Sequence, residues 1–221
     1  MSSSLNTTSK GLDCCRRGTI HTGTPTGKEI TLAGRQAYFT PAPNGNPVGA
    51  LVYVTDAMGW NLNNARLLAD TYAADGNLDV YIPNVLDKDA IPLGAFNDPN
   101  NPFDLASWVQ KIISLRSGHE SAYIDAIKEL RSKYQHIAAS GYCWGGYFTI
   151  RFAQRDDLVD CSIASHPSLV AVPGDIEPIK KPVLFVCAEV DEQFGEEKRE
   201  ASKEILSKKE TGSEFKLYPG K

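Results

Sequence analysis

The stretch Gly141-Tyr142-Cys143-Trp144-Gly145-Gly146 decides how this sequence folds. It follows a short apolar run at 137–140 and precedes a helical pattern at 147–154. A strand, a tight Gly-x-Cys-x-Gly-Gly turn and a helix form a nucleophile elbow, in which the strained central side chain points out of the turn. Glycines at 141 and 145 let other backbone segments pass close to that residue. The pattern therefore predicts a nucleophile at Cys143, whose thiolate the following helix dipole would favour. The alternative is a buried core cysteine beside a glycine-rich turn.

Strand and helix patterns alternate along the rest of the chain. The expected strands are 48–55, 78–83, 137–140, 161–165, 182–188 and 215–218, after an extended edge pair within 29–40. The expected helices are 61–75, 120–134, 147–154 and 195–208. Such alternation predicts a mostly parallel sheet with crossover helices. Together with the elbow, this arrangement is typical of an α/β-hydrolase type of fold, with helices on both faces of the sheet. Active residues then collect at the carboxyl ends of the strands. The polar stretch 84–102 is predicted to be a long surface loop that shapes specificity.

The composition is that of one ordinary globular domain. The 221 residues are 42% hydrophobic and 23% charged. The net charge of −4 does not favour nucleic acid or an anionic membrane as a partner, and no apolar run has the length of a membrane span. The polar lead 1–10 is expected to be disordered and lacks the apolar segment of a signal peptide, which leaves 11–221 as a single domain.

Cysteine and histidine usage bears on location and on cofactors. The five cysteines have no framework spacing, which together with the missing signal predicts a cytoplasmic protein. The histidines show no metal-ligand spacing, so no metal or other cofactor is expected. Three of them are predicted to be structural residues in turns or at strand entries: His21, His119 and His136.

Asp191 is the candidate catalytic acid. It follows the expected strand at 182–188 by a few residues, and α/β-hydrolases order their catalytic residues as nucleophile, acid and histidine. The acid would orient and stabilise a catalytic imidazole. The alternatives are a solvated loop carboxylate or an N-cap for the helix from 195 onward. Glu189 is a weaker candidate for the same role.

The segment Asp56-Ala57-Met58-Gly59-Trp60, after the expected strand at 48–55, is the candidate oxyanion loop. In an α/β-hydrolase such a loop supplies one oxyanion N–H, and the residue after the nucleophile supplies the other. This nominates the backbone amides of Ala57 and Trp144. The alternative is a helix entry turn with an Asp cap. The indoles of Trp60 and Trp144 would either wall an apolar substrate pocket or belong to the core.

The histidine that should complete the set is missing. It is expected after the strand at 215–218, but the sequence continues only with Pro219-Gly220-Lys221, and no histidine follows His166. His166 ends an expected strand at the active edge and is a candidate substrate contact, although it precedes Asp191 and so stands in the wrong order for the usual base. The alternative is a neutral imidazole hydrogen-bonded within a loop.

Taken together, these segments resemble the dienelactone hydrolase family, in particular its fungal cytosolic members, from about residue 14 to 221. The elbow at 141–146 is the most specific likeness. The others are Cys14-Cys15, His21-x-Gly23-Thr24-Pro25-x-Gly27, Thr55-Asp56-Ala57-Met58-Gly59, His166-Pro167-Ser168, Ala188-Glu189-Val190-Asp191 and Tyr218-Pro219-Gly220.

The resemblance implies a Cys-His-Asp triad, in which Cys143 and Asp191 match the first and last members. It also implies an acidic residue in the oxyanion loop that contacts the resting thiol, the place of Asp56. In the family, His-Gly-Phe follows Tyr-Pro-Gly by a few residues. This sequence ends before it, so we expect a chain truncated before its catalytic histidine and a final helix.

One departure limits what the resemblance implies about substrate. Bacterial members carry a Pro-Asp-Leu-Tyr segment and an arginine that help bind the lactone carboxylate. Here the segment reads Pro83-Asn84-Val85-Leu86-Asp87 without a nearby arginine. The resemblance therefore extends to ester hydrolysis and not to the dienelactone itself.

The sequence thus predicts a cysteine-dependent hydrolase of a small-molecule ester or lactone, acting through an acyl-enzyme and nearly inactive without its histidine. Class I glutamine amidotransferases also place cysteine on a strand-to-helix turn, but they need a His-x-Glu pair near the end, which is absent. A non-catalytic binding or scaffold protein on a hydrolase fold is the other alternative, and the missing histidine is its only support.

Overall fold

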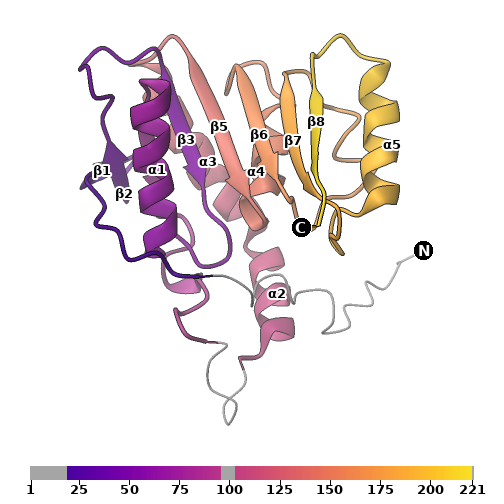
Figure 1. The fold of residues 1–221 in the computed structure, drawn as a ribbon, viewed down its shortest axis with the longest axis horizontal. Helices are drawn as coiled ribbons and strands as arrows, with labels where there is room; N and C mark the ends of the chain where they lie inside the picture. The colour runs from indigo at the N-terminus through magenta and orange to yellow at the C-terminus, as the bar shows by residue number, and fades with distance from the viewer. Residues whose placement is uncertain (1–18, 96–102, 221) are drawn as a thin grey trace.

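The alternating pattern folds into a single eight-stranded sheet in the order β1-β2-β4-β3-β5-β6-β7-β8 (Figure 1). The computed structural model describes residues 19–95 and 103–220. The strands are β1 (Lys28–Leu32), β2 (Arg35–Thr40), β3 (Ala50–Val54), β4 (Asp79–Pro83), β5 (Ile137–Tyr142), β6 (Cys161–Ser165), β7 (Val183–Ala188) and β8 (Glu214–Tyr218). The helices are α1 (Asn63–Gly76), α2 (Leu105–Ser114), α3 (Arg116–Arg131), α4 (Trp144–Phe152) and α5 (Glu196–Ser207), with a 3-10 turn η2 (Asp87–Asp89).

Strand direction places the ends of the central strands together. β1 and β2 form an antiparallel hairpin, and β2 runs antiparallel to β4. From β4 to β8 every neighbouring pair is parallel. The last residues of β5 and β6 are close to one another in register, with Tyr142 opposite Ser165. The segments that follow β3, β5, β6 and β7 therefore meet at one edge of the sheet.

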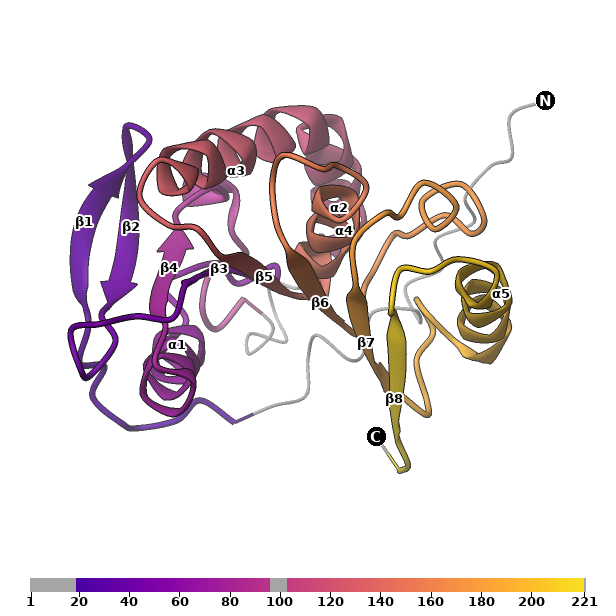
Figure 2. The ribbon, with the colours of Figure 1, turned by 90° about the horizontal axis from the view of Figure 1, so that it is seen from above.

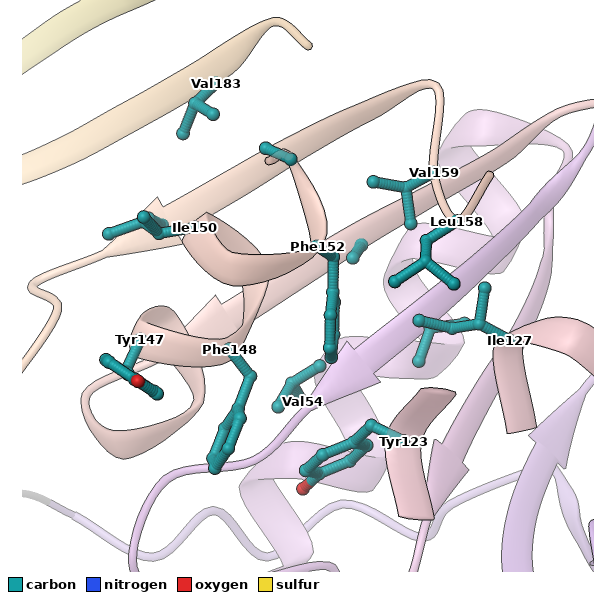
Figure 3. Close-up of a cluster of buried hydrophobic side chains, with 14 of the residues drawn as sticks. Val54, Tyr123, Ile127, Tyr147, Phe148, Ile150, Phe152, Leu158, Val159 and Val183 are labelled. Carbon is teal, nitrogen blue, oxygen red and sulfur yellow. The ribbon is translucent and has the colours of Figure 1, made fainter. Parts of the chain in front are cut away.

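Helices cover both faces of the sheet. Figure 2 shows α3 and α4 on one face and α1 on the other. On the first face, Phe148 and Phe152 of α4 pack with Tyr123 of α3 and Val54 of β3 in the main hydrophobic core (Figure 3). On the second face α1 buries only alanines, which are Ala65, Ala69 and Ala73. Small side chains let this helix lie close to the sheet, and the cluster there includes Tyr38, Tyr53 and Trp60.

A third cluster lies at the carboxyl edge. Ala57, Ile91, Leu105 and Val109 pack together there, and the Ile91 N–H donates to the Ala57 carbonyl at 2.8 Å. Figure 1 shows α2 beyond the edge at which β5 ends. α2 and the 84–95 segment thus anchor the loop that follows β3.

The predicted α/β fold, with its mostly parallel sheet and helices on both faces, is confirmed. Two local predictions are wrong. The described part of the 84–102 stretch, residues 84–95, is not simply a surface loop, because Val85, Leu86 and Ile91 are buried. The helix expected from 120 begins at Arg116, and α2 was not predicted.

Some predictions cannot be compared with the structure. The lead 1–10, the pair Cys14-Cys15 and the part of the loop at 96–102 lie outside the described residues. Among the helices that are described, none is long and apolar enough to cross a membrane.

Candidate active site

Cys143 occupies the turn between β5 and α4. Its φ of 52° lies in the left-handed region, which costs a residue with a Cβ about 1 kcal/mol or more. The glycines on either side make the turn possible. A Cβ on Gly141 would overlap the carbonyl oxygen of Gly145, and a Cβ on Gly145 would overlap that of Val54. The elbow therefore rests directly on the end of β3, with Cys143 at the N-terminus of α4.

The two nominated oxyanion amides lie at the expected places. Trp144 is the first residue of α4, where a backbone N–H has no partner within the helix. Ala57 follows β3 and is held through its carbonyl by Ile91. Neither amide donates any of the loop, turn or cap backbone hydrogen bonds of residues 19–95 and 103–220. Both N–H groups are thus available to a ligand in the described structure.

Asp56 is a largely buried carboxyl group beside the elbow. Its Oδ1 accepts the Met58 N–H at 2.8 Å, so it caps its own turn and not α1, which begins only at Asn63. Burial raises the pKa of Asp56 to about 6. The Met58 N–H opposes this rise in pKa, the negative charge of Cys143 adds to it, and His166 opposes it. Asp56, Cys143 and His166 therefore lie within electrostatic reach of one another.

The segment after β6 contacts Cys143 through its backbone and its side chain. The Cys143 N–H donates to the Ser165 carbonyl at 3.0 Å, and the Cys143 carbonyl accepts the Ser168 N–H at 3.0 Å. The thiol donates to the Ser168 hydroxyl, with Sγ and Oγ 3.6 Å apart. His166 is exposed, has a φ of 37° and donates its N–H to the Val186 carbonyl. The predicted position of His166 at the active edge agrees with this geometry.

Asp191 lies in a tight turn after β7. Its Oδ1 accepts the N–H groups of Gln193 at 2.8 Å and Phe194 at 2.9 Å. Its Oδ2 is buried and accepts no hydrogen bond from the described residues. The N-cap of α5 is Gly195, without a side-chain cap, so the alternative of Asp191 as a helix cap is wrong. Glu189 is already engaged, because it accepts the Gly220 N–H at 2.7 Å.

The two indoles belong to the core. Trp60 is 5% exposed in the cluster on the α1 face, and the Arg66 guanidinium lies 4.7 Å above its ring. Trp144 is 2% exposed and packs edge-on against Phe148 and His119. The two alternatives were walls of an apolar substrate pocket and residues of the core, and this packing agrees with the core. His119 lies within α3 and not in a turn, and burial lowers its pKa.

The sequence did not identify Ser168 as a contact of the thiol. The available signals were its place just after a strand of the parallel sheet and its position in the segment His166-Pro167-Ser168. Across the described ranges, no group of three or more His, Cys, Asp or Glu side chains is placed to hold a metal ion.

Comparison with known proteins identifies the family. Residues 36–221 match the model of the dienelactone hydrolase family. Hydrolase tropI of Talaromyces stipitatus is 31% identical over 94% of this chain and 82% of its own. Dienlactone hydrolase 1 of Gibberella moniliformis is 32% identical over 93% of this chain and 79% of its own. A dienelactone hydrolase-like promiscuous phosphotriesterase from metagenomic libraries shares the fold, with a TM-score of 0.63 and 18% identity over 90% of this chain and 83% of its own. The chain therefore belongs to the dienelactone hydrolase family of α/β-hydrolases.

Proposed function

We propose that this protein hydrolyses small esters or lactones through a thioester formed on Cys143. The observation that carries the proposal is the elbow, where a strained cysteine at the start of α4 rests on the end of β3. Backbone strain of this kind persists where the surroundings hold it in place, and it concentrates at active sites. The other cysteines described are less suited to attack, since partial desolvation raises the pKa of Cys161 and burial raises that of Cys187 to about 11.

The reaction has two halves. In the first, the Cys143 thiolate attacks the carbonyl carbon, a tetrahedral oxyanion forms, and its collapse breaks the ester C–O bond. The departing alkoxide takes a proton and leaves as an alcohol, which in a lactone stays attached to the acyl group. In the second half, water attacks the thioester carbon, the C–S bond breaks, and the acid is released with the thiol restored.

The amides of Ala57 and Trp144 would hold the oxyanion in both halves. One preorganised donor of this kind is typically worth about 3 kcal/mol in the transition state. Two features support the assignment. The Ala57 peptide is fixed by the bond from Ile91, and the Trp144 N–H is at the positive end of the α4 dipole.

Asp56 would keep the resting nucleophile protonated. A carboxylate in a poorly solvated position beside Cys143 disfavours a second negative charge on sulfur. Because the pKa of Asp56 is raised to about 6, the carboxyl is mostly ionised at neutral pH. The negative charges of Asp56 and Cys143 therefore disfavour one another.

Asp191 would orient an imidazole, and its buried Oδ2 accepts no hydrogen bond from the described residues. None of the four histidines of residues 1–221 occupies that position. Loss of one triad member commonly costs about 10⁴-fold in rate. We therefore propose that the 221-residue chain turns over slowly, and that an added imidazole at Asp191 speeds the reaction.

Turnover of an activated ester such as p-nitrophenyl acetate tests this proposal. The parent chain is compared with Cys143→Ala and with Cys161→Ala, which removes an exposed cysteine outside the site. Mass spectrometry locates the acetyl group, and the assay is repeated over a series of imidazole concentrations. We expect acylation of Cys143, loss in Cys143→Ala, retention in Cys161→Ala, and a rate that rises with imidazole in the parent more than in Asp191→Asn.

Two results would count against the proposal. Equal ester hydrolysis by the parent and Cys143→Ala would show that Cys143 is not the nucleophile. No acylation of Cys143 at any imidazole concentration would favour a non-catalytic binding protein on the hydrolase fold. The five cysteines have no framework spacing, and we propose that the protein acts in the cytoplasm.

A further inference from the structure

We infer that Ser168 is a positioning residue for the nucleophile, whose hydroxyl accepts from the resting Cys143 thiol and donates to the thiolate that replaces it. This inference rests on the proposed function, because it assigns a partner to the same sulfur. It adds a residue that lies outside the elbow, the oxyanion loop and the Asp191 turn.

Three hydrogen bonds tie Cys143 to the segment 165–168, which we call the clasp. Two involve the cysteine backbone, with the Ser165 carbonyl and the Ser168 N–H each at 3.0 Å. The third joins Sγ to the Ser168 hydroxyl at 3.6 Å. The backbone hydrogen bonds fix the positions of Cys143 and Ser168 relative to one another. The two short side chains are therefore held in contact by the backbone.

Backbone strain is concentrated at the same place. Six described residues other than glycine have a positive φ, and they are Ala33, Asn77, Asp87, Cys143, His166 and Leu169. Three of the six therefore lie in the elbow or directly around the clasp. Such conformations cost about 1–3 kcal/mol each and persist only where the surroundings over-determine them. This cost is consistent with a segment shaped to hold the nucleophile.

The Ser168 side chain has no other task in the described structure. It is 5% exposed, and its hydroxyl makes no hydrogen bond other than that with the thiol. A buried hydroxyl without a partner is costly. The sulfur is thus the group that satisfies it.

A hydroxyl suits both states of the nucleophile. It has lone pairs that accept from S–H and a proton that it can turn toward S⁻. Asp56 interacts electrostatically with Cys143 and His166, and also with the phenols of Tyr53 and Tyr123. Ionised Asp56 disfavours the thiolate, whereas the α4 N-terminus favours it. The Ser168 hydroxyl is a further hydrogen-bond donor that favours the thiolate.

The pH dependence of thiol alkylation tests this role. Iodoacetamide is reacted with each variant from about pH 5 to about pH 10, and mass spectrometry gives the rate at Cys143. We expect Ser168→Ala to move the inflection upward by about one pH unit and to slow alkylation about 10-fold below it, since a hydrogen bond to a charged group favours the ionised form by that order. Ser168→Thr, which keeps the hydroxyl, should restore the parent profile.

Ser162→Ala is the matched control. It removes another buried hydroxyl, 2% exposed on β6, which has no hydrogen-bond partner in the described chain. It should leave the pH dependence of Cys143 alkylation unchanged. Should the alanine variant fold poorly, Ser168→Thr and Ser168→Val give the same comparison at nearly equal size. A Ser168→Ala or Ser168→Val profile that coincides with that of the parent would overturn the inference.

Ester acylation of the parent separates the two proposals. Acylation at Cys143 with no shift on removing the hydroxyl would overturn the role of Ser168 and leave the proposed function in place. A shift without any acylation would count against the proposed function and leave the role of Ser168 in place, as the partner of a thiol that does not hydrolyse esters.

Discussion

Neutralising Asp56 should stabilise the protein at neutral pH. The carboxyl lies beside Cys143, and burial raises its pKa from 3.8 to about 6. In Asp56→Asn the side-chain oxygen still accepts the Met58 N–H, so the turn keeps its hydrogen bond. What disappears is the charge that the folded protein has to accommodate in a poorly solvated position.

The sign and size follow from proton linkage. The folded protein holds its proton up to about pH 6, whereas the unfolded chain releases it near pH 4, so the folded state binds more protons between these values. The stability of the parent therefore falls as the pH rises through that window, and the deficit is complete above it. A shift of about 2 units at 1.36 kcal/mol per unit gives about 3 kcal/mol. Because the side chain keeps some exposure to solvent, we expect about 2–3 kcal/mol.

Urea unfolding at about pH 4 and about pH 8 measures this effect as a double difference. The variant should match the parent at the lower pH and exceed it by about 2–3 kcal/mol at the higher. Titrating groups that do not interact with Asp56 cancel, because both proteins carry them. Asp75→Asn, at an exposed position on α1, is the control and should show no such dependence. An Asp56→Asn gain that is the same at both pH values would refute the reasoning.

Substitutions at three further positions test the architecture of the site and of the sheet. Gly145→Ala places a methyl group against the Val54 carbonyl. The free energy of unfolding in urea should therefore fall by about 1–3 kcal/mol. An unchanged free energy of unfolding would argue against this contact. Asp191→Ala removes the oxygen that accepts two N–H groups of its own turn and should cost about 1–3 kcal/mol. Asp191→Asn keeps an acceptor for these N–H groups and should destabilise the protein less. Equal losses of stability in thermal melting would contradict the hydrogen bonds assigned to this turn. Phe185→Ala removes a buried ring stacked 4.5 Å from Phe215 and should cost about 3–5 kcal/mol in the same urea assay.

Buried strands and the elbow were predictable from the sequence because their signals are local. An apolar run at 48–55 predicts a strand buried on both faces, and β3 spans Ala50–Val54 with every residue buried. The helical pattern at 195–208 predicts α5, which spans Glu196–Ser207. The spacing of glycines around Cys143 predicts a tight turn, and the positive φ of Cys143 agrees with it. In each case neighbouring residues carry the information.

α2 was missed even though its sequence carries a signal. Leu105, Val109 and Ile112 are its buried residues, at helical spacing, and Asp104 caps the helix by accepting the Ser107 N–H. The polar stretch before α2 favoured the prediction of a loop. The burial of Ile91 beneath α2 depends on contacts with Ala57, a residue far away in the sequence, and no local pattern reports such a contact.

The contacts that define the chemistry of the site are also non-local, and this limits what a motif can predict. Cys143 and Ser168 are brought together by two parallel strands and the helix between them, since β5 pairs with β6 and α4 crosses over. A Gly-x-Cys-x-Gly-Gly pattern therefore predicts where the sulfur lies but not which groups surround it. Those groups are Asp56 from the end of β3 and Ser168 from the end of β6, one opposing the thiolate and the other supporting it. The reactivity of the sulfur depends on the balance between them, so the alkylation profiles of Asp56→Asn and Ser168→Ala should shift in opposite directions.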